Sequence, residues 1–97
     1  MAFLSELASS TSRQLQSTSP ALIVPVGSVE QHGPHLPLDT DTRIATAVAR
    51  SVADRLTDRN ESNCALAPAI GYGASGEHEG FPGTVSIGTS ALRLLLV

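Results

Sequence analysis

Two short apolar runs dominate the hydrophobic pattern of the sequence. The first, Leu22 to Val26, is rich in β-branched residues and is bracketed by Pro20 and Gly27. The second extends from Cys64 to Ile70. Short apolar runs bounded by Gly or Pro are typical of strands that are buried on both faces. We therefore expect two core strands.

Between these runs, apolar residues recur with the period of an α-helix from Thr42 to Arg59. A repeat of four residues places an apolar stripe along one side of a helix. A strand, a helix and a second strand in this order predict a βαβ unit, whose strands are parallel and whose crossover is right-handed. The expected fold class is therefore α/β. The repeating residues are Ile44, Val48, Val52 and Leu56.

The first 20 residues and the segment after the helix have weaker patterns. Residues 1–20 begin with an apolar patch of Phe3, Leu4 and Leu7 and then become rich in Ser and Thr, which predicts a short helix and a surface connection. The segment 60–63 predicts a turn. Its Asn-Glu-Ser triplet matches a glycosylation acceptor, but no secretory signal precedes it, so we interpret it as part of the turn.

The last part of the sequence predicts a brief strand and a helix. Thr84 to Ile87 indicates the strand, and Thr89 is expected to cap a helix that continues to Leu96. The sequence stops at Val97 inside this apolar segment, without a C-cap or polar tail. We interpret this ending as a truncation.

A polar loop follows the first strand and carries several possible metal ligands. Glycine and proline are interleaved with these side chains and prevent both a helix and a continued sheet ladder. The loop should therefore leave the strand end as a rigid, polar segment. The acidic and imidazole side chains are Glu30, His32, His35, Asp39 and Asp41.

The spacing of these ligands has two interpretations. In extended backbone, Glu30 and His32 lie on one side of the chain, and Asp41 could join them to give the mixed oxygen and nitrogen donors that suit zinc, manganese or iron(II). Three ligands are too few for a site with two ions. Alternatively, the polar residues are solvated turn formers, and Asp39 or Asp41 caps the next helix.

Composition limits the classes of partner. The 97 residues include 41% hydrophobic residues, enough for a core, and carry a net charge of −3. Neither nucleic acid nor an anionic membrane is an expected partner, because the sequence has no basic cluster. The first residues do not show the positive region and apolar core of a signal peptide, and no run approaches the roughly 18 apolar residues of a membrane span. We therefore expect a cytoplasmic protein.

Two further features have a structural and a functional interpretation. The only cysteine, Cys64, lies in an apolar run and is expected to be a small buried hydrophobic residue. Gly71, Gly73 and Gly76 match a dinucleotide-binding pattern, but the Gly- and Pro-rich residues after them cannot open the helix that such a site requires, so we expect no nucleotide.

His78 follows in the same glycine-rich loop. Its imidazole could contact a substrate or could hydrogen-bond within its own loop. The neighbouring Glu77 and Glu79 are expected to be solvated. Because ligands of open α/β sheets bind beyond the carboxyl ends of the strands, the Glu30 and His32 loop and the loop from Gly71 to Thr84 should share one edge.

Two blocks of the sequence resemble the signature of the creatininase family, the creatinine amidohydrolases and their relatives. They are GSVEQHGPHLPLDTDT, from Gly27 to Thr42, and SGEHEGFPGTVSI, from Ser75 to Ile87. The resemblance implies a metal-dependent hydrolase of C–N bonds that forms closed oligomers. It also implies that residues 1–97 are a single creatininase-like domain, incomplete at the C-terminus, from the N-terminal part of a three-layer α/β/α fold.

The resemblance assigns roles to individual residues. It implies two divalent metal ions per site, zinc, iron(II) or manganese, with Glu30 on one ion, His32 on the other and Asp41 bridging both. It places the His78 loop at the mouth of the active site, which makes His78 a candidate catalytic residue. Further family ligands, including a His in an Asn-Gly-His block, have no counterpart in this sequence.

Three functions remain open from the sequence. Within the family, HGPHLPLDTDTRIATAVA resembles peptidases that release a C-terminal Val-Tyr dipeptide from a ribosomally made precursor peptide. A cyclic amidohydrolase of the creatininase type is the alternative enzyme. The third possibility is a non-catalytic binding or assembly piece, because exposed apolar surface on so short a chain can be an interface.

Overall fold

The computed structural model describes residues 5–16, 18–59 and 63–97. The chain divides into two compact units, one formed by Met1–Pro25 and Ala47–Pro68 and the other by Val26–Thr46 and Ala69–Val97. We refer to them as unit 1 and unit 2. A single domain over residues 1–97 stays a prediction.

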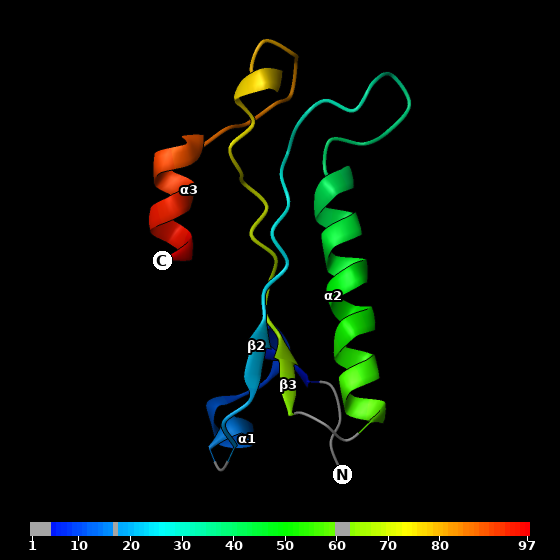
Figure 1. Ribbon diagram of the computed structural model, residues 1–97, viewed down its shortest axis with the longest axis vertical. Coiled ribbons are helices and arrows are strands. Elements are labelled where there is room, and N and C mark those ends of the chain that lie inside the picture. Colours follow the sequence, from blue (N-terminus) through cyan, green and yellow to red (C-terminus); the bar gives the residue numbers. More distant parts are fainter. Residues whose placement is uncertain (1–4, 17, 60–62) are drawn as a thin grey trace. The chain divides into compact units, whose positions relative to one another are not determined.

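Unit 1 contains a small parallel sheet (Figure 1). Its strands are β1 (Ser5–Glu6), β2 (Ala21–Ile23) and β3 (Cys64–Leu66), in the order β1-β3-β2. Both β1 and β2 pair in parallel with β3. The predicted parallel pairing of the two apolar runs is therefore confirmed, whereas β1 was not predicted.

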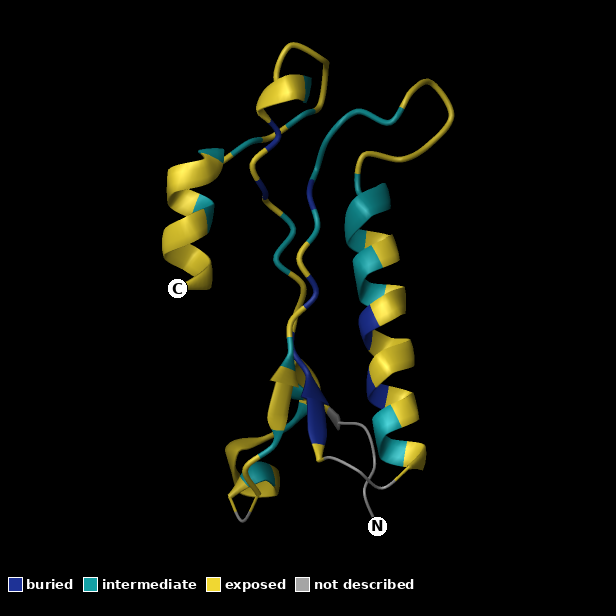
Figure 2. Ribbon diagram, viewed as in Figure 1, coloured by how far each residue is buried: buried dark blue, intermediate teal, exposed yellow. Residues whose placement is uncertain are grey.

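The two predicted core strands differ in burial (Figure 2). The central strand, β3, is buried along its whole length, including Cys64, as predicted. The prediction of a fully buried strand from Leu22 to Val26 is wrong, because Leu22 is 54% exposed. The physical reason is position: β2 pairs with β3 on one side only and forms an edge of the sheet.

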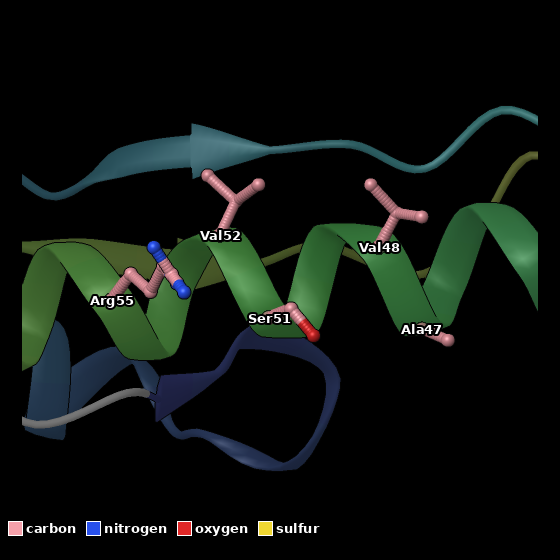
Figure 3. Close-up of a pocket in the computed structure, with 5 residues that line it drawn as sticks. All are labelled: Ala47, Val48, Ser51, Val52 and Arg55. Atoms are coloured by element: carbon pink, nitrogen blue, oxygen red, sulfur yellow. The ribbon is translucent and has the colours of Figure 1, made fainter.

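Helix α2 (Thr40–Asp58) confirms the helix predicted from the four-residue repeat and begins two positions earlier. Its buried residues are the small Ala49 and Ala53, whereas the larger Val48 and Val52 are exposed. With Ala47, Ser51 and Arg55 these valines line a hollow of about 350 Å³ in unit 1 (Figure 3). No helix in the described part of the chain is long and apolar enough to cross a membrane.

The rest of unit 1 is built from short elements. A 3-10 helix η1 (Leu7–Ser9) and helix α1 (Ser12–Leu15) follow β1, and Thr11 begins α1 with a capping box. The short helix predicted at the apolar patch is replaced there by β1 and η1, and α1 lies in the Ser- and Thr-rich stretch that was expected to be a surface connection. An ion pair between Arg50 and Glu6 links α2 to β1. The predicted roles of Phe3, Leu4 and the triplet at 60–62 lie outside the described residues.

Unit 2 is organised by three single bridges between loop segments. Val26 pairs in parallel with Ile70, Val29 pairs antiparallel with Val85, and Gly73 pairs in parallel with Ser86. The first two bridges join the loop after β2 to the two halves of the loop that precedes α3, and the third joins these halves to each other. The brief strand predicted at Thr84 to Ile87 is present only as such bridges.

Two short helices complete unit 2, η2 (Gly76–His78) and α3 (Gly88–Leu96). The prediction that Thr89 caps α3 is wrong, because the N-cap is Ile87 and Thr89 is the second helical residue. The Ser86 hydroxyl instead accepts a hydrogen bond from the amide of Gly88, 3.2 Å away. A side chain outside the helix therefore satisfies this backbone donor.

The loop after β2 passes unusually close to the start of α2. A Cβ atom on Gly27 would lie 2.3 Å from Oγ1 and 2.4 Å from Cα of Thr42. The Thr42 hydroxyl accepts from the Ser28 amide and donates to the Ser28 carbonyl, at 3.1 Å in each case. Glycine at position 27 is therefore required for the approach that allows this double hydrogen bond.

We predict that Gly27→Ala destabilises unit 2. The added methyl group meets backbone atoms, which cannot move aside as a flexible side chain would, so the free energy of unfolding should fall by about 1–3 kcal/mol or more. Urea unfolding of the complete gene product measures the change. Gly80→Ala is the matched control, because its Cβ would meet nothing within 4 Å and should change stability by less than about 1 kcal/mol. Equal effects of the two variants would contradict the close-approach argument.

Candidate active site

The candidate site lies within unit 2, where three segments bring polar side chains together. The loop after β2 contributes Glu30 and His32, the first turn of α2 contributes Asp41, and the loop before α3 contributes His78. The His78 Nε2 atom lies 2.7 Å from Glu30 Oε2. The Ser75 hydroxyl, 2% exposed, lies 3.3 Å from Glu30 Oε1. The two loops therefore contact each other, whereas their place at one edge of the sheet stays a prediction.

Ser28 occupies the centre of this cluster. Its hydroxyl lies 2.7 Å from Glu30 Oε1 and 2.8 Å from Asp41 Oδ2, and the residue is 6% exposed. A hydroxyl has one hydrogen to donate, so it can satisfy only one of two carboxylates at a time. The cluster thus holds two carboxylates at close range. Their oxygen atoms can accept more hydrogen bonds than the neighbouring groups donate.

The Ser28 hydroxyl also affects the acidity of Asp41. Its hydrogen bond is the main reason that the pKa of Asp41 lies below the ordinary value of 3.8. Burial acts in the opposite direction, and the charge and hydrogen bond of His32 lower the pKa further. Asp41 is therefore held in its charged form.

His32 contacts an acceptor at each ring nitrogen. Its Nδ1 lies 3.1 Å from the Glu30 carbonyl oxygen, and its Nε2 lies 3.1 Å from Asp41 Oδ1. The hydrogen bond to the Glu30 carbonyl is the first cause of the raised pKa of His32, and the Asp41 carboxylate contributes to it. Since Nδ1 must donate to a carbonyl, a second proton or a cation has to lie between Nε2 and Asp41.

This geometry suits a metal ion in donor type and spacing. Nitrogen and oxygen donors at about 2.1 Å from one ion are about 3.0–3.4 Å apart for angles of roughly 90–110°, and His32 Nε2 and Asp41 Oδ1 are 3.1 Å apart. Across residues 5–16, 18–59 and 63–97, however, no group of three or more His, Cys, Asp or Glu side chains is placed to hold an ion. The cluster therefore offers ligand atoms of a suitable type. In this structure these atoms are engaged in hydrogen bonds and do not form a complete ligand set.

The structure separates the predicted ligands into two groups. Glu30, His32 and Asp41 belong to the cluster. His35 is exposed, and Asp39 pairs with Arg43 at 2.8 Å on the first turn of α2. Asp41 lies inside the helix, where its carboxylate contacts side chains of the preceding loop, which favours a role in the cluster over that of N-cap.

His78 lies between the two loops. Its Nε2 faces Glu30, and its Nδ1 lies 2.9 Å from Nε2 of Gln31. Its contacts therefore extend beyond its own loop, contrary to the purely local interpretation. As predicted, Glu77 and Glu79 are exposed.

Three residues of the cluster were not found by sequence reasoning. Ser28, Gln31 and Ser75 are neutral and carry no ligand signature of their own. The sequence spacing could have indicated Ser28, because it stands two positions before Glu30. Side chains alternate along extended backbone, so both lie on the same side. No comparable signal pointed to Gln31 or Ser75.

The chain is similar in sequence and in structure to proteins of one family. The family described as creatinine amidohydrolase matches residues 5–97. The mycofactocin precursor peptide peptidase of Mycolicibacterium smegmatis is 65% identical over 97 residues. The creatinine amidohydrolase of Pseudomonas putida is 36% identical over 76 residues. A solved structure of a mutant creatininase matches with a TM-score of 0.76 and 27% identity.

The extent of these matches differs between the chains. The match to the M. smegmatis protein covers 100% of this chain and 39% of that protein. The P. putida match covers 73% and 27%, and the creatininase structure covers 99% and 38%. The chain therefore spans about two fifths of the M. smegmatis relative. The structural match confirms the predicted α/β class and its creatininase-like fold.

We predict that Ser28→Ala raises the pKa of Asp41. A carboxyl group with a lowered folded-state pKa stabilises the fold above its ordinary pKa, and this contribution is lost as the pH falls through the folded-state value. Removing the main cause of the lowering should reduce this contribution, so the variant should be less stable than the wild type at pH 7, and the difference should shrink as the pH falls through the folded-state pKa of the wild type. The loss of unfolding free energy at pH 7 should be about 1 kcal/mol, reduced by solvent screening because the Asp41 side chain is 42% exposed.

The measurements are the side-chain carboxyl resonance of Asp41 as a function of pH and the unfolding free energy across the same range. Ser51→Ala on α2 is the control, since Ser51 is exposed and lies in unit 1. An unchanged Asp41 midpoint in Ser28→Ala would contradict the central role of the hydroxyl.

Proposed function

The chain belongs to the creatininase family, and from this membership we propose that its protein is a metal-dependent hydrolase of C–N bonds. The observation that carries the proposal is the cluster of Glu30, His32 and Asp41, in which His32 Nε2 lies 3.1 Å from Asp41 and one hydroxyl lies within 2.8 Å of both carboxylates. Ser28 links the two carboxylates of this cluster.

We propose that Glu30, His32 and Asp41 are metal ligands, with Asp41 shared between two ions of zinc, manganese or iron(II). Bound ions of this kind polarise a scissile carbonyl and lower the pKa of a water molecule toward about 7. The hydrogen bond from His32 Nδ1 to the Glu30 carbonyl fixes the ring and directs Nε2 at Asp41. The ligand set needs further donors from outside this chain.

His78 is the proposed catalytic residue of the second loop. Its imidazole is 26% exposed and adjoins Glu30, so it can reach both the cluster and a substrate in the solvent. A neutral imidazole at this place could donate a hydrogen bond to a substrate or accept its proton.

The proposed substrate is a ribosomally made precursor peptide, from which a C-terminal Val-Tyr dipeptide is released. The support is the 65% identity to the mycofactocin precursor peptide peptidase of M. smegmatis, compared with 36% to the creatinine amidohydrolase of P. putida. We also propose that the protein is cytoplasmic and forms homo-oligomers, without nucleic acid or a membrane as partner, in line with its net charge of −3.

A peptide-release assay tests the substrate. With the complete gene product loaded with Zn²⁺, Mn²⁺ or Fe²⁺, we expect the Val-Tyr dipeptide to be released from a synthetic precursor peptide and creatinine to remain intact. Creatinine turnover without peptide cleavage would contradict the peptide proposal and favour the cyclic amide. No turnover of either compound would favour a binding or assembly role.

We predict that Asp41→Asn lowers metal content and hydrolysis together. The substitution removes the negative charge of a ligand shared by two ions, whereas His32→Ala should chiefly empty one position. Elemental analysis of the purified protein, with thermal melts alongside, measures the effect. If Asp41 only begins the helix, Asn serves nearly as well there, and metal stoichiometry and stability should be unchanged. That result would exclude the bridging role.

A further inference from the structure

Gln31 is held at both ends of its side-chain amide. Its Oε1 accepts a hydrogen bond from the Gly33 backbone amide at 2.9 Å, and its Nε2 lies 2.9 Å from His78 Nδ1. Gly33 has a φ of 75°, a conformation that side-chain-bearing residues rarely adopt, and this turn directs its N–H back at Gln31. Because the oxygen is committed to Gly33, the amide nitrogen must face the imidazole.

The orientation of Gln31 determines the tautomer of His78. An amide NH₂ group only donates, so His78 Nδ1 has to accept and carries no hydrogen. The proton of the neutral imidazole then resides on Nε2, which lies 2.7 Å from Glu30 Oε2 and donates to it. The backbone of Gly33 thus sets the direction of a hydrogen bond to Glu30 through two side chains.

Neighbouring contacts hold this chain of hydrogen bonds in place. The Gln31 backbone amide donates to Thr84 Oγ1 at 3.1 Å, which ties the first loop to the second. The His78 ring lies beside Phe81, with centroids 6.3 Å apart. The other carboxylate near His78 is Glu77, at 3.5 Å with a side chain that is 86% exposed, so it competes weakly with Glu30.

We propose that Gln31 is a positioning residue that, through His78, orients the Glu30 carboxylate with a fixed N–H donor. The consequence for metal binding rests on the proposed function, whereas the hydrogen-bond chain itself does not. A carboxylate that keeps one oxygen occupied by a donor presents the other in a defined direction, and loss of such supporting contacts typically lowers metal affinity about 10- to 100-fold.

The hydrogen-bond chain can be observed directly by NMR. In the ¹⁵N-labelled complete gene product at about pH 8, where an ordinary imidazole is neutral, we expect His78 to be protonated at Nε2. We also expect a ¹⁵N–¹⁵N coupling across the hydrogen bond between Gln31 Nε2 and His78 Nδ1. The signals of His78 are identified by their loss in His78→Gln. Protonation of Nδ1 in the wild type, or the absence of the coupling, would overturn the proposal without any need for a variant of Gln31.

Gln31→Glu reverses the donor and tests the positioning role. A carboxylate can only accept, so a hydrogen should appear on His78 Nδ1, and the Zn²⁺ affinity measured by competition with a chelator should fall about tenfold. Gln31→Met, which removes the donor and keeps the length of the side chain, should lower the affinity in the same direction. Gln16→Glu introduces the same charge at an exposed position in unit 1 and should change neither quantity.

The outcomes separate this inference from the proposed function. If the wild type binds no Zn²⁺ but shows the expected tautomer and coupling, the hydrogen-bond chain stands and the metal function fails. If Zn²⁺ binds with equal affinity to the wild type, Gln31→Glu and Gln31→Met, the positioning role is wrong. An unchanged His78 tautomer in folded Gln31→Glu would also contradict it.

Discussion

The candidate site depends on the close approach of two backbone segments at Gly27 and Thr42. A side chain at position 27 would collide with the backbone of Thr42, and the Thr42 hydroxyl makes two hydrogen bonds to Ser28. Each of these residues stands next to a member of the cluster, Ser28 after Gly27 and Asp41 before Thr42. Closing the loop at this point therefore brings the carboxylates of Glu30 and Asp41 to the same hydroxyl, although eleven positions separate them in the sequence.

Charge is distributed in this cluster so that a cation would satisfy several groups at once. The Ser28 hydroxyl has one hydrogen for two carboxylates, and His32 Nε2 faces the oxygen of Asp41. In the structure, the hydrogen bond to the Glu30 carbonyl raises the pKa of His32, the hydrogen bond from Ser28 lowers that of Asp41, and the contact between His32 and Asp41 adds to both shifts. A metal ion would replace those contacts. Gln31 and Gly33 act one step further out, by directing the donor of His78 at Glu30.

Hydrophobic periodicity predicted much of the fold because it acts locally. The repeat from Ile44 to Leu56 located α2, and the run from Cys64 located the central strand. Local pattern could not reveal that β2 lies at an edge, because strand order depends on β1, which is only two residues long. The charged members of the site were identified from their spacing and the family motif. The roles of Ser28 and Gln31 were not predicted from the sequence, because a neutral side chain gains its role only from contacts with distant segments.

The central claim is that the side chains of Glu30, His32 and Asp41 exchange hydrogen bonds for contacts to metal. Crystals of the complete gene product grown with Zn²⁺ or Mn²⁺, measured at the absorption edge of the metal, test this most directly. We expect anomalous density in contact with both carboxylates and with His32 Nε2, and we expect the hydrogen bond from His32 Nδ1 to the Glu30 carbonyl to be retained. Anomalous density elsewhere in the protein, with the His32 to Asp41 contact intact, would contradict it.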